Sequence, residues 1–199
     1  MIVREIFTSL QGEGANFGRL ATFVRLSGCN LSCDFCDTDF SFGEKYTLDR
    51  LVSEVRKEGT SFLIWTGGEP LLQLTEETVL RFKSLGYRQA VETNGTMRPP
   101  KGLDYISCSP KVDLPTLWKN FDGIEVGEFR YPVANGLEIP SVDDLPLARN
   151  YFLSPIFEGK ADSGKELFSQ DNLALCMDLI RKDPRWRLSV QMHKFLRIS

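Results

Sequence analysis

Short apolar runs alternate along this chain with segments whose apolar residues recur at helical spacing. Buried strands of about four to eight residues produce such runs, whereas a helix places apolar residues three and four positions apart. Helical spacing predicts one helix after Thr47, one after Thr75 and one around residues 173–180, and both threonines are suitable N-caps. The apolar runs predict strands at residues 21–26, 61–66, 89–93, 105–109, 123–126, 151–153 and 188–191.

Repeated strand, helix, strand units favour parallel pairing, because a strand that joins its neighbour in parallel needs a long crossover, usually a helix. We therefore predict an α/β fold, an incomplete TIM-like β/α barrel of parallel strands, formed by residues 1–199 as a single domain. A chain of 199 residues is long enough for one sizeable core. Residues 111–150 are rich in proline and poorly periodic, so they predict little.

The composition of the chain limits the classes of partner that it is expected to bind. The chain is 42% hydrophobic and 26% charged, with a formal net charge of -3 and a pI near 5.3. These values give no electrostatic reason to expect nucleic acid as a partner, and no apolar stretch approaches the roughly 20 residues of a membrane span. The N-terminal residues lack the apolar core of a signal peptide, and five cysteines are an odd number for a disulfide framework. We expect a cytoplasmic protein with a small-molecule partner.

Three of the cysteines lie within eight residues. Cys29, Cys33 and Cys36 form a C-x3-C-x2-C run with no fourth cysteine nearby, while Cys108 and Cys176 lie in apolar patterns and are expected in the core. Structural zinc sites and electron-transfer clusters usually have four protein ligands. Three thiolates can instead hold an iron–sulfur cluster with one iron open to another ligand, which makes this loop a candidate reaction centre.

The distinctive polar residues follow the predicted strands. The cysteine loop follows the first strand, residues 66–69 the second, residues 92–95 the third and residues 109–111 the fourth. In parallel α/β folds, ligands bind at the carboxyl ends of the strands. Four successive strand ends are therefore expected to face one cavity.

These motifs together resemble a known family. Gly67-Gly68-Glu69-Pro70 and the cysteine run are similar to radical S-adenosylmethionine enzymes. The segments at 7–14 (Phe-Thr-Ser-Leu-Gln-Gly-Glu-Gly), 36–38 (Cys-Asp-Thr), 92–96 (Glu-Thr-Asn-Gly-Thr), 109–111 (Ser-Pro-Lys) and 191–196 (Gln-Met-His-Lys-Phe-Leu) resemble the 7-carboxy-7-deazaguanine synthases within that superfamily.

The resemblance implies a reaction and its cofactors. A 4Fe-4S cluster would bind S-adenosylmethionine at its open iron and, once reduced, cleave it to a 5'-deoxyadenosyl radical that takes a hydrogen atom from the substrate. The substrate would be 6-carboxy-5,6,7,8-tetrahydropterin, converted with loss of ammonia to 7-carboxy-7-deazaguanine, a precursor of queuosine-type tRNA bases. The resemblance also implies Mg2+, an electron donor such as flavodoxin or ferredoxin, and a homodimer.

The resemblance also implies roles for individual residues of this chain. The cluster ligands would be Cys29, Cys33 and Cys36, and Thr38 would bind magnesium. S-adenosylmethionine would meet Phe35, Cys36, Asp37, Gly68, Glu69, Ser109, Pro110 and Lys111. The pterin would meet Leu10, Gln11, Gly12, Glu13, Arg25, Thr66, His193 and the terminal residue Ser199.

Two segments depart from the family pattern. Ser154 stands where a glutamine is expected before Pro155, and residues 125–133 differ from the expected segment.

Two other interpretations stay open. A zinc-binding module could use the three cysteines and His193, the only histidine, although zinc ligands are usually closely spaced. A glycyl-radical activating enzyme acting on a partner protein would share the cysteine loop, but it would not need a pterin-reading pair such as Gln11 and Glu13.

Overall fold

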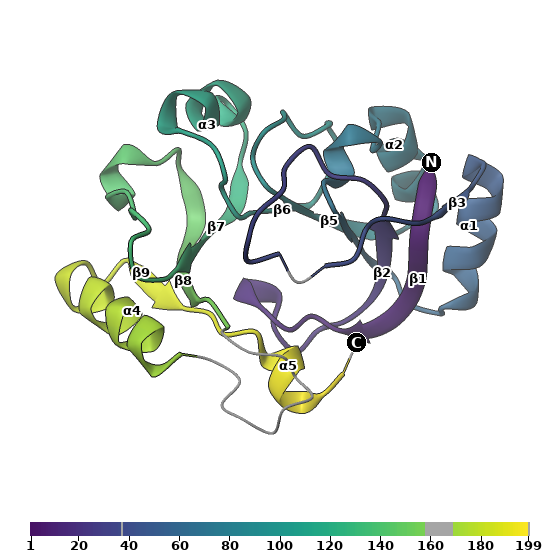
Figure 1. Cartoon of the computed structure of the whole chain (residues 1–199). Helices are drawn as coiled ribbons and strands as arrows, with labels where there is room; N and C mark the ends of the chain where they lie inside the picture. Colours follow the sequence, from purple (N-terminus) through teal and green to yellow (C-terminus); the bar gives the residue numbers. More distant parts are fainter. Residues whose placement is uncertain (37, 158–168, 199) are drawn as a thin grey trace.

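A single mixed sheet organises the molecule. The structure, a computed structural model, describes residues 1–36, 38–157 and 169–198. The sheet has nine strands in the order β3-β1-β2-β4-β5-β6-β7-β8-β9 and curves without closing on itself through hydrogen bonds (Figure 1). The strands are β1 (Ile2–Leu10), β2 (Leu20–Leu26), β3 (Glu44–Lys45), β4 (Phe62–Gly67), β5 (Arg88–Thr93), β6 (Tyr105–Cys108), β7 (Val126–Val133), β8 (Ala148–Pro155) and β9 (Trp186–Leu188).

Every neighbouring pair from β2 to β9 is parallel, whereas β1 pairs antiparallel with both β2 and β3. The predicted incomplete barrel is therefore confirmed, with one correction at its N-terminal edge. Parallel strands were expected throughout, and β1 and β3, the two strands at this edge of the sheet, were not predicted. The connection from β1 to β2 is short and contains only the 3-10 helix η1 (Gly14–Asn16), and such a short link joins strands that run in opposite directions.

Helices cover the convex side of the sheet (Figure 1). The three predicted helices are present, and Thr47 and Thr75 cap the first two by accepting hydrogen bonds from the backbone N–H groups of Arg50 and Thr78. Two further helices, α3 and α5, were not predicted. The helices are α1 (Leu48–Lys57), α2 (Glu76–Ser84), α3 (Leu114–Phe121), α4 (Gln170–Lys182) and α5 (Met192–Leu196), with short 3-10 turns η2 (Pro70–Leu72) and η3 (Val142–Asp144). Among the residues described, no helix is long and apolar enough to cross a membrane.

The two faces of the sheet have different partners. Leu63 and Trp65 of β4 belong to the large core beneath the helices, whereas Phe62 and Ile64 join a small cluster that includes Tyr105. Side chains of a strand alternate between faces. Further along the strands, the face that carries the small cluster therefore presents polar side chains to the concave side of the barrel.

Two predicted strands were misplaced. The strand expected at 123–126 is β7, which extends to Val133, because Phe129 and Tyr131 pack in the large core while Glu128 and Arg130 alternate with them on the concave face. Charged residues at every second position interrupt the apolar run on which the prediction depended. The strand expected at 188–191 ends at Leu188, since the following residues leave the sheet and lead into α5.

Candidate functional site

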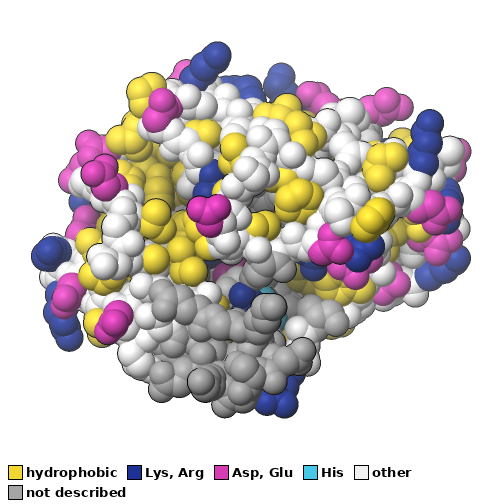
Figure 2. Space-filling model, viewed as in Figure 1, with side chains coloured by type: hydrophobic (Ala, Val, Ile, Leu, Met, Phe, Trp, Pro, Cys, Tyr) yellow, Lys and Arg dark blue, Asp and Glu magenta, His cyan; other side chains and the backbone are white. Residues whose placement is uncertain are grey.

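A cavity of about 1730 Å³ lies over the carboxyl ends of the parallel strands. Its walls include the cysteine loop after β2 and residues that follow β4, β5 and β6, so the four predicted strand ends do face one cavity. On the face seen in Figure 2, charged side chains lie mostly toward the periphery. The cavity is lined by these residues predicted for the site: Leu10, Gln11, Gly12, Glu13, Arg25, Cys29, Cys33, Phe35, Cys36, Thr38, Thr66, Gly68, Ser109, Lys111 and His193.

The cysteine loop presents three separate thiols to this cavity. Cys29 and Cys33 are partly buried and Cys36 is exposed, and a turn is closed by the Cys36 N–H donating to the Cys33 carbonyl at 3.0 Å. Burial raises the pKa of the Cys33 thiol, while the positive charge of Lys111 acts in the opposite direction. In the part of the chain described here, no three Cys, His, Asp or Glu side chains converge on a point that could hold a single ion. Thiols spaced around a loop suit a cluster in which each thiolate binds a different iron.

The glycine turn after β4 packs directly on the start of the cysteine loop. The Glu69 N–H donates to the Gly28 carbonyl at 2.9 Å, and the Gly68 N–H donates to the Leu26 carbonyl at 3.2 Å. A Cβ at Gly68 would overlap the Gly28 carbonyl and lie 2.8 Å from Cys29 Cβ. Only glycine permits this approach, so the turn and the cysteine loop form one unit at the cavity wall.

Two residues predicted for cofactor binding are not among those that line the cavity. Pro110 is buried. The carboxylate of Glu69 is also fully buried, and it accepts hydrogen bonds from the backbone N–H groups of Leu71 at 2.9 Å and Asn94 at 2.7 Å. Burial raises the pKa of Glu69 and these hydrogen bonds oppose the shift. The side chain of Glu69 thus joins the turn after β4 to the end of β5. Asp37 and Ser199, also predicted for the site, lie outside the described residues.

Lys111 contributes a half-buried positive charge near the cysteines. Its Nζ donates to Ser109 Oγ at 2.7 Å and lies 5.4 Å from the centre of the Phe35 ring. Burial lowers the pKa of Lys111 to about 8, although the neighbouring Cys33 favours the charged form. A cation in this position can pair with a carboxylate of a bound ligand.

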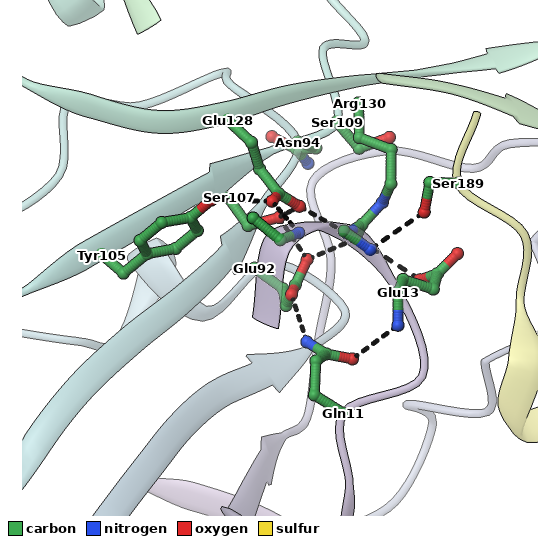
Figure 3. Close-up of polar contacts among 12 residues, drawn as sticks. Gln11, Glu13, Glu92, Asn94, Tyr105, Ser107, Ser109, Glu128, Arg130 and Ser189 are labelled. Carbon is green, nitrogen blue, oxygen red and sulfur yellow. Dashed lines mark hydrogen bonds and ion pairs between the residues drawn. The ribbon is translucent and has the colours of Figure 1, made fainter. Parts of the chain in front are cut away.

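A polar network fills another part of the cavity (Figure 3). The Gln11 amide donates to Glu92 Oε1 at 2.8 Å, and its oxygen accepts from the Glu13 N–H at 3.3 Å. The guanidinium of Arg130 lies 2.6 Å from Glu92 Oε2 and 3.4 Å from Glu13 Oε2. Gln11, Glu13, Glu92 and Arg130 all line the cavity. This part of the site therefore holds two carboxylates and one amide in fixed positions.

The network is anchored below the cavity by Glu128 of β7. One oxygen of Glu128 accepts from Arg130 Nη1 at 2.8 Å, and the other accepts from the Tyr105 hydroxyl at 2.8 Å and from the Ala15 N–H at 2.9 Å. Ser107 Oγ lies between Glu92 and Glu128, at 2.8 and 2.9 Å. The side chain of Glu128 is only 2% exposed. Strands β5, β6 and β7 and the loop after β1 are thus joined beneath the cavity.

Charges in the network influence one another strongly. Burial raises the pKa of Glu92, and the neighbouring Glu128 and Glu13 add to the shift, whereas Arg130 lowers it. Burial by itself would lower the pKa of Arg130, but Glu13, Glu92 and Glu128 together raise it, so the guanidinium stays charged. Arg130 is therefore the positive charge that opposes the upward shift of the Glu92 pKa.

Arg25 of β2 also lines the cavity, and its Nε lies 2.6 Å from Glu5 Oε1. The guanidinium also lies over the Phe7 ring, which stacks on Phe23 at 5.1 Å between centroids. Near the rim, α5 approaches the loop after β1, where the Met192 N–H donates to the Gly12 carbonyl at 3.1 Å. A Cβ at Gly12 would lie 2.9 Å from His193 Cβ, so glycine permits this close docking.

Sequence reasoning missed three of the network residues. Ser107, Glu128 and Arg130 were not proposed for the site, and Glu92 was noted at a strand end and in the 92–96 segment of the family resemblance but was given no role in the site. The signal was present in β7, where charged residues occupy alternate positions between apolar ones. Residues 125–133 were set aside as a departure from the family pattern, yet they supply the guanidinium that contacts Glu13.

Comparisons with known proteins agree with this geometry. Residues 23–110 match the model of the Radical SAM superfamily. A 7-carboxy-7-deazaguanine synthase of Bacteroides thetaiotaomicron is 38% identical over 98% of this chain and 97% of its own length. The chain belongs to the 7-carboxy-7-deazaguanine synthase family. Membership of the radical SAM superfamily implies a 4Fe-4S cluster and S-adenosylmethionine, and the thiols and the glycine turn at the cavity wall suit both.

Other members support the assignment. A 7-carboxy-7-deazaguanine synthase of Caulobacter vibrioides is 34% identical over 98% of this chain and 97% of its own length. The crystal structure of QueE from Escherichia coli matches with a TM-score of 0.70 and 22% identity, and the match covers 96% of this chain and 94% of that one. This structural match shows that the fold is shared. The family relationship favours the synthase over the zinc module and the activating enzyme.

Proposed function

We propose that this chain converts 6-carboxy-5,6,7,8-tetrahydropterin to 7-carboxy-7-deazaguanine with release of ammonia, in the formation of queuosine-type 7-deazapurines. The observation that carries the proposal is the division of one cavity into two parts. One part presents three thiols, a glycine turn and the half-buried Lys111, and the other presents the amide and carboxylates of Gln11, Glu13 and Glu92. A radical enzyme needs both parts, since the cofactor and the substrate must lie side by side.

The cofactor part has a role for each residue. Cys29, Cys33 and Cys36 hold the cluster, which when bound and reduced supplies the electron that cleaves S-adenosylmethionine. Gly68 lets the backbone of its turn come close to the methionine portion of the cofactor. Lys111 pairs with its carboxylate, supported by Ser109, and the Phe35 loop covers the site. Asp37, which lies outside the described residues, stays a predicted backbone contact of the cofactor.

The substrate part matches the polarity of a pterin. The aminopyrimidinone ring carries neighbouring N–H donors along one edge, and carboxylates are the strongest acceptors that a protein offers to such groups. Glu13 and Glu92 receive this edge beside Leu10, Gln11 and Gly12. Arg25, which also lines the cavity, is paired with Glu5 through Nε, so its terminal nitrogens can bind the substrate carboxylate in a bidentate manner. Thr66 and His193 complete the enclosure, and Ser199, outside the described residues, stays a predicted substrate contact.

A magnesium ion is part of the proposal. Thr38 lines the cavity close to the cysteine loop and offers a hydroxyl oxygen, which suits a hard cation. One protein ligand is few for magnesium, so the substrate and water supply the rest of the shell. We also propose that the enzyme works as a homodimer in the cytoplasm and receives its electron from a flavodoxin or ferredoxin.

The proposal is tested by anaerobic reconstitution with iron and sulfide, followed by incubation with S-adenosylmethionine, reductant, magnesium and 6-carboxytetrahydropterin. Mass spectrometry of the products should show 7-carboxy-7-deazaguanine. Formation of 5'-deoxyadenosine without this product would support the assignment of radical chemistry and refute the assignment of the substrate.

A further inference from the structure

We propose that Arg130 is a positioning residue for substrate recognition: its guanidinium holds the Glu13 and Glu92 carboxylates in place to receive the N–H edge of the pterin. The inference rests on the proposed function and adds to it a residue that carries the geometry of the substrate part. It concerns the arrangement of acceptors before substrate arrives.

Arg130 bridges a buried anchor and two cavity-lining groups. Nη1 is 2.8 Å from Glu128 Oε1, and Nη2 is 2.6 Å from Glu92 Oε2 and 3.4 Å from Glu13 Oε2. Glu128 is 2% exposed and is absent from the cavity lining, whereas Glu13 and Glu92 are 17% and 20% exposed and belong to it. The planar fork of the guanidinium thus transmits the fixed position of Glu128 to the two carboxylates that face the ligand.

The hydrogen-bond inventory explains why the arginine is needed. Ser107 Oγ is within reach of both Glu92 and Glu128, but a hydroxyl has one proton and donates to one acceptor at a time. The Gln11 amide donates to Glu92 only through Oε1. Without Arg130, Glu92 Oε2 and Glu128 Oε1 would compete for the single proton of the Ser107 hydroxyl. Arg130 supplies each of these two oxygens with its own N–H donor.

The charge balance indicates a ligand. Three carboxylates surround one guanidinium, so the cluster carries more acceptors than an ion pair needs for its own stability. A ligand edge with several neighbouring N–H donors complements this surplus, whereas an anionic edge would be repelled. The substrate carboxylate should consequently point away from Arg130, toward the wall that carries Arg25.

Three variants test the inference in the full, reconstituted enzyme. Arg130→Met keeps much of the side-chain volume and removes the fork and its charge. Arg130→Lys keeps the charge without the fork. Arg185→Met is the matched control, because Arg185 also pairs with two carboxylates, those of Asp143 and Asp183, but on the surface. For each variant, KM and kcat for 6-carboxytetrahydropterin and the ratio of 5'-deoxyadenosine to product are measured.

We expect Arg130→Met to raise KM for the pterin by about ten- to a hundredfold, the loss expected when a charge-assisted hydrogen bond is removed. The ratio of 5'-deoxyadenosine to product should rise, because a poorly oriented substrate no longer receives every radical. Arg130→Lys should recover part of the loss, and Arg185→Met should leave the kinetic constants unchanged. An unchanged KM and ratio in Arg130→Met would overturn the inference.

A pH profile separates positioning from simple packing. Without Arg130 the pKa of Glu92 rises further, so the carboxylate is protonated at a higher pH and the acidic limb of kcat/KM should move upward. Arg130→Lys should keep the limb near that of the native enzyme, and a limb unmoved in Arg130→Met contradicts the inference. The ionisable groups that interact with Glu92 are those of Glu13, Tyr105, Cys108, Glu128 and Arg130.

Folding and substrate identity have their own controls. If Arg130→Met does not fold, the double variant Arg130→Met with Glu128→Gln removes one buried negative charge together with the positive one, and it should fold and still show the raised KM; a native KM in it would refute the inference. Failure of the native enzyme to form 7-carboxy-7-deazaguanine refutes the proposed function. If the native enzyme forms the product and Arg130→Met has the native KM and product ratio, only the role of Arg130 is refuted.

Discussion

The two parts of the cavity are built in different ways. The cofactor part is made by loops of consecutive residues, the cysteine loop 29–36 and the glycine turn 67–68, which approach each other through backbone atoms. The substrate part is made by side chains from separate strands, with Glu92 on β5 and Arg130 on β7. A local motif can specify the first part, whereas the second depends on the register of strands distant in sequence.

This difference has consequences for mutation. Loss of a cysteine removes an atom that nothing else replaces, so effects in the cofactor part should be close to all-or-none. In the substrate part, more than one carboxylate receives the N–H edge of the pterin. Loss of one carboxylate should therefore weaken pterin binding and lower the yield of product per cofactor cleaved, without stopping cofactor cleavage.

Cys33→Ala should have the largest effect and should break the cofactor part alone. We expect loss of cluster absorbance and no detectable 5'-deoxyadenosine after reduction with S-adenosylmethionine, since two thiolates cannot hold the cluster. Cys176→Ala, a buried cysteine of α4, is the matched control and should retain the iron content. Iron analysis and product quantification check both, and cofactor cleavage by Cys33→Ala would refute the assignment.

Glu92→Gln should break the substrate part alone. The neutral amide has nearly the same shape but offers a weaker acceptor, so KM for the pterin should rise about ten- to a hundredfold. 5'-Deoxyadenosine should still form, in excess over product. Glu44→Gln removes a carboxylate that pairs with Arg50 on the surface and should change neither value. Steady-state kinetics with 5'-deoxyadenosine and 7-carboxy-7-deazaguanine both measured would show whether KM for the pterin and the ratio of the two products change together. An equal loss of both products would contradict the separation of the cavity into a cofactor part and a substrate part.

Gly68→Ala should sharpen the boundary between the parts. The added Cβ would overlap the Gly28 carbonyl and press on Cys29 Cβ, so either the turn or the cysteine loop must move. Overpacking of this kind costs about 1–3 kcal/mol, and we expect the affinity for S-adenosylmethionine to fall about tenfold while pterin affinity is retained. Equilibrium binding of each ligand checks this, and equal weakening of both ligands would show that the parts are not separate.

Thr38→Ala should have the smallest effect. Loss of one oxygen from a magnesium shell that the substrate largely completes should raise the magnesium concentration needed for half-maximal turnover and leave uncoupled cofactor cleavage in place. Ser41→Ala is the control, because Ser41 is a nearby hydroxyl residue that is not among those lining the cavity. Normal turnover of Thr38→Ala with unchanged magnesium dependence would remove this residue from the proposal.

The same difference decided what the sequence could predict. The spacing of Cys29, Cys33 and Cys36 and the glycine turn are local patterns, and apolar runs located the strands beneath them. Strand β7 was predicted too early in the chain because Glu128 and Arg130 interrupt its apolar positions, and the pairing of Arg130 with Glu92 depends on how β5, β6 and β7 align. Strand β1 was not predicted, since its exposed and half-exposed positions do not form a buried run. The residues that shape substrate recognition were thus the hardest to predict.

The most direct test of the two-part cavity is an anaerobic crystal structure of the reconstituted enzyme with S-adenosylmethionine and 6-carboxytetrahydropterin. We expect the cofactor between the cysteine loop and Lys111, with the N–H edge of the pterin on Glu13 and Glu92 and its carboxylate toward Arg25. A pterin bound with its carboxylate toward Glu92, or outside the network of Arg130, would contradict it.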